Sequence, residues 1–225
     1  KSLFKNISVY FFTFCTSLTT ILTYSRSAWL LIFIGTLLMF GKKCFRFIRN
    51  IFMGIILIFI ATIFPFFGLY IQKFFKFFIP QPIWMEFSDF QFSRLEIWQS
   101  GISSIFKFPI FGTGASSFPE IFFSETGLWK GHAHNLPLEL MISYGIPAGI
   151  IVISPILIIS FLSAKKIFKI SNKKISNNFD KAWVTSLLII LISQMVDVQY
   201  FDGRISIILW ILISGSRNII REKNL

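Results

Sequence analysis

Two histidines are the only imidazole side chains in the sequence, and they lie two residues apart within residues 131–135. Imidazole has an ordinary pKa close to neutral pH, so His134 is a candidate general base that accepts a proton from an attacking hydroxyl. His132, Asn135 and Glu139 are candidate supporting residues that could orient this base. No third metal ligand is spaced convincingly from the two histidines, so we predict no metal, and two solvated loop histidines are the alternative.

Two arginines are candidates for binding a phosphate or diphosphate group. Arg26 lies between two apolar runs, and Arg94 opens a more polar, amphipathic stretch. A guanidinium carries a permanent charge and fixed N–H donors, which suit the negative charge that develops on a diphosphate leaving group. The alternatives are that Arg26 only reaches toward lipid headgroups and that Arg94 only faces water.

Two other polar groups carry weaker signals. Residues 112–114 read Gly-Thr-Gly, but they lack the Lys-Ser or Lys-Thr pair of a phosphate-binding P-loop, so we predict a structural turn. Asp197, Asp202 and Arg204 cluster around one short loop between apolar runs. For these three residues a local ion pair is the favoured interpretation.

The apolar runs that separate these residues are long enough to cross a membrane. The 225-residue chain is 54% hydrophobic and 14% charged, with a mean hydropathy of +0.71, which excludes an ordinary soluble domain and a disordered chain. The predicted fold class is all-α, a polytopic membrane protein with about six transmembrane helices. Their predicted ranges are 7–24, 28–40, 51–71, 135–163, 182–198 and 205–213.

The distribution of charge predicts the orientation of these spans. Alternating spans divide the net charge of +12 into +13 on one side of the membrane and −1 on the other. By the positive-inside rule the first side, which holds both ends of the chain, is cytoplasmic, and residues 72–134 form a large periplasmic loop. This distribution accounts for the basic excess without a nucleic-acid partner. We expect a single transmembrane domain over residues 1–225, the C-terminal part of a longer protein.

The periplasmic loop contains a predicted amphipathic helix over residues 93–108. Its apolar residues recur at spacings of three and four, which is typical of one helical face, and Ser93 and Pro109 suit its start and its end. Such a helix lies in the membrane interface and would place Arg94 at the boundary between water and lipid. The apolar residues of this face are Leu95, Trp98, Ile102, Ile105 and Phe106.

Three elements together resemble the O-antigen ligase and polymerase superfamily of bacterial membrane glycosyltransferases. They are Ser25-Arg26-Ser27-Ala28, then Arg94-Leu95-Glu96-Ile97-Trp98 followed by Pro109-Ile110-Phe111-Gly112-Thr113-Gly114, and His134-Asn135 with Gly145 after nine intervening residues. Their order, spacing and membrane side all fit. The chain departs from the family pattern at Ala148, where the family often has a second glycine, and this loosens the likeness to the ligase branch more than to the superfamily.

The resemblance implies a GT-C-like membrane fold and a metal-independent glycosyl transfer, with no cofactor, on the periplasmic face of the bacterial inner membrane. The donor would be a glycan on undecaprenyl diphosphate. The acceptor would be lipid A–core in a ligase or another glycan in a polymerase. Carried onto this sequence, Arg26 and Arg94 would hold the diphosphate, and His134 would activate the acceptor hydroxyl.

Two other classes of function are open at this point. A transporter for a small anion such as bicarbonate would carry ionisable residues or broken helices at mid-span, and the three prolines within residues 135–163 favour it. The near absence of charge within the predicted spans argues against it. A non-catalytic membrane scaffold would leave Arg26, Arg94 and His134 far apart.

Overall fold

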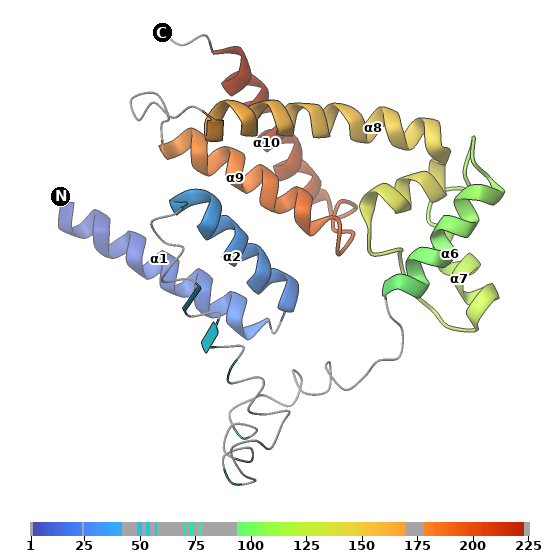
Figure 1. Ribbon diagram of the computed structural model, residues 1–225, viewed down its shortest axis with the longest axis horizontal. Coiled ribbons are helices and arrows are strands. Elements are labelled where there is room, and N and C mark those ends of the chain that lie inside the picture. Colours follow the sequence, from blue (N-terminus) through green and yellow to red (C-terminus); the bar gives the residue numbers. More distant parts are fainter. Residues whose placement is uncertain are drawn as a thin grey trace. The chain divides into compact units, whose positions relative to one another are not determined.

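The computed structural model describes residues 2–23, 25–41, 94–169 and 178–222, with a few isolated positions between 49 and 77. All regular structure in these described residues is helical, which confirms the all-α class (Figure 1). The chain divides into two compact units, Lys1–Gln91 and Phe92–Leu225. The predicted span over residues 51–71 lies largely outside the described residues.

The first unit contains a helical hairpin. Helices α1 (Ser2–Leu22) and α2 (Arg26–Phe40) correspond to the first two predicted spans and pack against each other. Ser25 caps α2, because its hydroxyl accepts a hydrogen bond from the Ala28 N–H at 3.3 Å. The Trp29 indole N–H donates to the Thr20 carbonyl at 3.2 Å and fastens the hairpin near its turn.

The second unit is built around three packed helices, α8 (Leu136–Lys169), α9 (Asn178–Ser193) and α10 (Gly203–Arg221). Two stretches, Leu136–Phe168 and Gly203–Arg221, are long and apolar enough to cross a membrane. A buried cluster joins the three helices, and large apolar side chains elsewhere on them are exposed, as expected for surfaces that face lipid. The buried cluster comprises Ile156, Leu187, Leu209 and Ile213. The described helices thus fit an all-α membrane protein, while six spans stay a prediction.

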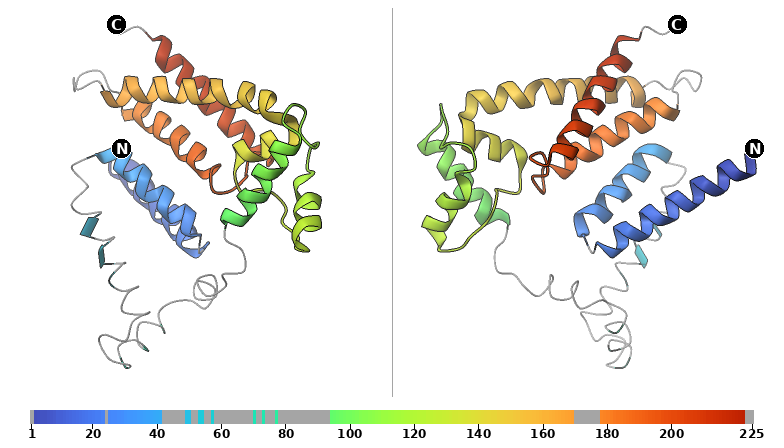
Figure 2. Two further views of the ribbon diagram at one scale, coloured as in Figure 1. Left: turned by 45° about the vertical axis from the view of Figure 1, so that its right-hand side comes forward. Right: turned by 180° about the vertical axis from the view of Figure 1, so that it is seen from behind.

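A sharp kink divides α8 into two helical segments. Gly145 has φ 85° and ψ 167°, far from helical values, and Figure 2 shows the change of direction between the segments. Pro137 and Pro147 stand in the first turns of the two segments, where a helix has no use for the missing N–H. Of the three prolines only Pro155 therefore lies inside a helical segment, and the break in α8 lies at Gly145. A broken helix is one of the features expected of a transporter, so the structure leaves that alternative open.

Helices α6 (Arg94–Lys107) and α7 (Phe118–Thr126) pack on the first segment of α8. Helix α6 confirms the predicted amphipathic helix, although Ser93 lies outside the described residues. Its buried residues are Ile97, Gly101, Ser104 and Ile105. The predicted apolar face is divided between two surroundings, because its Ile105 is buried against the protein and its Trp98 packs on the same buried cluster. Leu95, Ile102 and Phe106 are exposed, because α8 covers the neighbouring face, and they are free to meet lipid.

Candidate functional site

The turn at residues 109–114 is hydrogen-bonded to the kink of α8. The Ile146 N–H, which would serve the Ile142 carbonyl in a regular helix, donates instead to the Pro109 carbonyl at 2.8 Å. The Thr113 N–H then donates to the free Ile142 carbonyl at 2.8 Å. Pro147 has no N–H for the Ser143 carbonyl, which accepts from the Gly114 N–H at 3.0 Å. Turn and kink therefore satisfy each other's backbone groups.

Only glycine fits at the two closest points of this contact. A Cβ on Gly112, at φ +69°, would lie 2.5 Å from the Ile142 carbonyl oxygen. A Cβ on Gly145, at φ +85°, would lie 2.0 Å from the Ile110 carbonyl oxygen. The positive φ values add a second reason, because side chains are strained in this region. The Gly-Thr-Gly sequence is thus a structural turn, as predicted, and it ties the end of α6 to the start of the long segment of α8.

The loop with the two histidines leads directly into α8 and is fixed at several points. Asn135 acts as the N-cap, because its side-chain oxygen accepts the Leu138 N–H at 3.0 Å. Glu139 is 3% exposed, and its carboxylate accepts the N–H of the fully buried Ala133 at 2.8 Å. His134 adopts a left-handed φ of +52°, which is unusual for a residue with a side chain. These contacts give His134 a defined backbone position.

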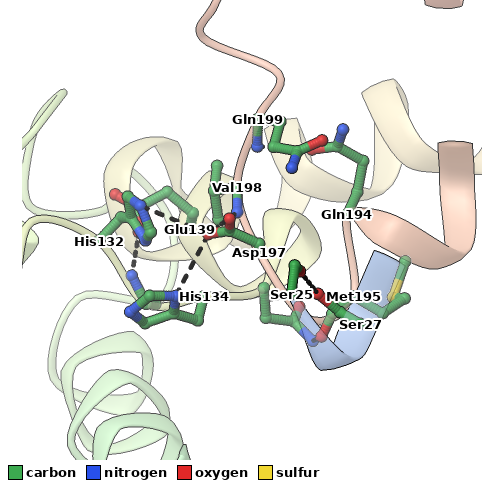
Figure 3. Close-up of polar contacts among 12 residues, drawn as sticks. Ser25, Ser27, His132, His134, Glu139, Gln194, Met195, Asp197, Val198 and Gln199 are labelled. Atoms are coloured by element: carbon green, nitrogen blue, oxygen red, sulfur yellow. Dashed lines mark hydrogen bonds and ion pairs between the residues drawn. The ribbon is translucent and has the colours of Figure 1, made fainter. Parts of the chain in front are cut away.

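The loop between α9 and α10 brings Asp197 to the histidines (Figure 3). The Asp197 Oδ1 lies 3.3 Å from His134 Nδ1 and 3.6 Å from His132 Nε2. The two imidazole rings meet edge to face, with centroids 4.3 Å apart. The described residues thus bring both histidines and one carboxylate into a cluster that we call the His–Asp cluster.

The loop that carries Asp197 has its own supports. The fully buried Gln194 accepts the N–H groups of Gln199 and Tyr200 with its side-chain oxygen, at 3.0 and 3.1 Å. Its backbone carbonyl accepts the Leu136 N–H at 2.8 Å, which joins this loop to the start of α8. The Asp197 carboxylate also accepts the Val198 N–H at 3.0 Å. Asp197 is therefore oriented before it meets the histidines.

The predicted ion pair in this loop is correct for two residues and wrong for the third. Arg204 pairs with Asp202 through two contacts of 2.8 and 3.1 Å, which lower the pKa of Asp202 to about 2. Asp197 instead pairs with the histidines of a segment 63 residues earlier in the chain. A signal in the sequence could have found it, since Asp197 and the histidines lie on loops predicted to share the periplasmic side.

The surroundings of His134 favour its neutral form. Partial burial lowers its pKa, the neighbouring His132 and the guanidinium of Arg94 lower it further, and the Asp197 carboxylate partly offsets them. Arg94, the first residue of α6, is thus near enough to act on His134 through its charge. Arg26 is the first residue of α2 in the other unit, and its part in a site stays a prediction.

The arrangement can support two kinds of chemistry. With Asp197 at His134 Nδ1, the N–H of the ring is held on that nitrogen, and Nε2 is left with the lone pair that a general base needs. The same cluster is a possible set of metal ligands, because its three ligand atoms lie within 4.8 Å of one another. The sequence offered no third ligand beside the two histidines, and the fold supplies one in Asp197.

Residues 11–153 match the family described as O-antigen ligase. This range contains Arg26, Arg94 and both histidines, while Asp197 lies beyond it. No curated protein and no solved structure matches the chain.

Proposed function

Since this chain belongs to the O-antigen ligase family, we propose that it transfers a glycan from an undecaprenyl-diphosphate carrier to an acceptor hydroxyl. The observation that carries this proposal is the pairing of His134, on the loop that enters α8, with Asp197, on the loop between α9 and α10. A sugar hydroxyl is a weak nucleophile until its proton has an acceptor. A neutral imidazole, held in one orientation by a carboxylate, is such an acceptor.

The proposed reaction is a single displacement at the anomeric carbon of the donor glycan. The acceptor hydroxyl gives its proton to Nε2 of His134 while its oxygen forms a bond to that carbon. The bond from the anomeric carbon to the diphosphate oxygen breaks, and undecaprenyl diphosphate leaves with the electron pair. Attack from the opposite face inverts the configuration of the carbon. Asp197 stabilises the imidazolium that forms, since its carboxylate lies 3.3 Å from Nδ1.

The leaving group gains negative charge, and arginine can balance it without a metal ion. We assign this role to Arg94, whose charge already acts on His134. Arg26 is proposed for the same role from its place in the resemblance. Guanidinium groups supply permanent charge and paired N–H donors, so the proposed transfer is metal-independent and needs no cofactor.

The membrane location follows from the donor and from the charges. A lipid-linked donor keeps its diphosphate at the membrane surface, and exposed Leu95, Ile102 and Phe106 of α6 suit that interface. We propose that the chain lies in a bacterial inner membrane with its ends in the cytoplasm and residues 72–134 in the periplasm, because the charge difference across the predicted spans favours this orientation. The acceptor is lipid A–core for a ligase. A polymerase that adds to another glycan is the alternative favoured by Ala148.

The test is a replacement of His134 in the full-length protein in the cell. His134→Ala should abolish the attachment of surface glycan and let lipid-linked glycan accumulate. A matched control is Glu120→Gln, at an exposed position on α7, which should leave both pools unchanged. Unchanged surface glycan in the His134→Ala strain, at equal protein level, would contradict the proposal. The length of the lipid-linked glycan that accumulates separates the two functions: long chains indicate a ligase, and single repeat units indicate a polymerase.

A further inference from the structure

The His–Asp cluster has the dimensions of a metal site that is already assembled. In tetrahedral coordination with metal–ligand distances of about 2.0–2.1 Å, neighbouring nitrogen and oxygen ligand atoms lie about 3.3 Å apart. Two edges of the cluster, from Asp197 Oδ1 to His134 Nδ1 and to His132 Nε2, are 3.3 and 3.6 Å. The ligand nitrogens of His132 and His134 lie within 4.8 Å of each other, so small side-chain rotations would complete three of the four coordination positions.

The ligand types favour a particular class of ion. Two imidazoles and one carboxylate suit Zn²⁺ and similar transition-metal ions, whereas Mg²⁺ and Ca²⁺ prefer sites made wholly of oxygen. The side chains of His132, His134 and Asp197 are 33%, 30% and 42% exposed, so water can reach the fourth position. The cap at Asn135 and the buried Glu139 fix the loop, which reduces the entropy lost when an ion binds.

We propose that the His–Asp cluster is a binding site for a divalent transition-metal ion of the Zn²⁺ class, and that the ion inhibits the enzyme. The inhibitory part rests on the proposed function. An ion on Nδ1 of His134 requires the remaining ring proton on Nε2, and that nitrogen then has no lone pair for the acceptor hydroxyl. The ion also takes the carboxylate of Asp197 away from its role beside the imidazole.

Direct binding is the first experiment, and it does not depend on activity. The purified full-length protein is freed of metal with a chelator, and Zn²⁺ or Mg²⁺ is titrated in by calorimetry. We expect saturable binding of one Zn²⁺ per chain and none of Mg²⁺. His132→Ala and Asp197→Ala should each weaken Zn²⁺ binding at least tenfold, while the control Glu125→Gln, an acidic residue elsewhere in the predicted periplasmic loop, should not. Equal binding by wild type and both variants would overturn the site.

Two further measurements separate loss of the metal ligands from loss of folding. His132→Gln and Asp197→Asn keep the side-chain size and guard against loss of folding, and both should also weaken Zn²⁺ binding. X-ray absorption of the Zn²⁺-loaded protein should show two imidazoles in the coordination shell, and a shell without imidazole would refute the assignment.

Activity is the second experiment. Zn²⁺ should suppress glycan transfer at the concentration that fills the site, and chelation should restore it. Zn²⁺ binding at the cluster with full transfer activity would overturn the inhibitory role. A protein that binds Zn²⁺ there but transfers no glycan under any condition would refute the proposed function and leave the metal site standing.

Discussion

Replacing Asp197 with asparagine isolates the charge that we assign to the proton-transfer step. Asparagine keeps the shape of the side chain, and its oxygen can still accept the Val198 N–H that orients Asp197. What is lost is the negative charge 3.3 Å from His134 Nδ1. We therefore expect the fold and donor binding to be unchanged, and the chemical step to slow.

The size of the effect follows from the separation and the exposure of the two groups. Unit charges about 4 Å apart interact by about 1 kcal/mol in water and about 4 kcal/mol in a partly shielded site. The side chains of His134 and Asp197 are 30% and 42% exposed, so screening brings the stabilisation of the imidazolium to about 2 kcal/mol. A loss of about 2 kcal/mol from the transition state lowers kcat about 30-fold.

The assay is single-turnover glycan transfer by the full-length protein in vesicles, with donor binding measured separately. Asp202→Asn is the matched control, because Asp202 lies in the same loop but pairs with Arg204 rather than with a histidine. It should retain nearly full activity. The double variant His134→Ala/Asp197→Asn should be no slower than His134→Ala, since the carboxylate acts through the imidazole. An Asp197→Asn rate within twofold of wild type, or an equal loss in Asp202→Asn, would refute the reasoning.

Three further predictions concern the supports of the site and its titration. Gly145→Ala should destabilise the fold by about 3 kcal/mol or more, because the new Cβ would lie 2.0 Å from a backbone oxygen. Gly114→Ala is the control and should cost about 1–2 kcal/mol, because Gly114 has a φ of +104° but nothing within 4 Å of its Cβ position. Thermal unfolding compares the two variants, and equal losses of stability would contradict the proposed backbone contact. Glu139→Leu should lower transfer activity, because the buried Ala133 N–H loses its acceptor. Glu139→Gln keeps an acceptor oxygen and should retain most of the activity. Transfer assays at equal protein level compare the variants, and equal activity would contradict a role of Glu139 in fixing the histidine loop. Because the pKa of His134 is lowered, the imidazole stays neutral at pH values below its ordinary pKa of about 6.5. The acid limb of the pH–rate profile, measured with chelator present, should therefore lie below about pH 6.5. An acid limb above that value would contradict His134 as the base.

Most helices of the second unit follow from local sequence patterns, although α7 was not predicted and α10 extends eight residues beyond its predicted end. Apolar periodicity and Pro109 predicted α6 within a residue of its observed ends, and the long apolar runs predicted the positions of α8, α9 and α10. Local rules succeed here because helix ends depend on caps, prolines and the period of nearby side chains. The side of α6 that packs on the protein was not predictable in this way, because the helix is apolar on two faces and only its neighbour α8 selects one.

The site itself depends on contacts between distant segments. Asp197 reaches the histidines only because the α9–α10 loop is joined to the start of α8 through Gln194. Likewise, Gly112 and Gly145 are explained by backbone contacts between segments thirty or more residues apart in the chain. Residue types and order identified His134 as a candidate base, but no local pattern indicates which carboxylate stands beside it.

The central claim is that His134 is the proton acceptor in a glycosyl transfer that needs no metal. The most direct measurement follows the release of undecaprenyl diphosphate from a lipid-linked glycan donor by the full-length protein in vesicles, with chelator present. Wild type should react fully, and His134→Ala should react about 10²- to 10⁴-fold more slowly with unchanged donor binding. A His134→Ala protein that retains its rate within a few-fold, or a wild-type protein that the chelator silences, would contradict the claim.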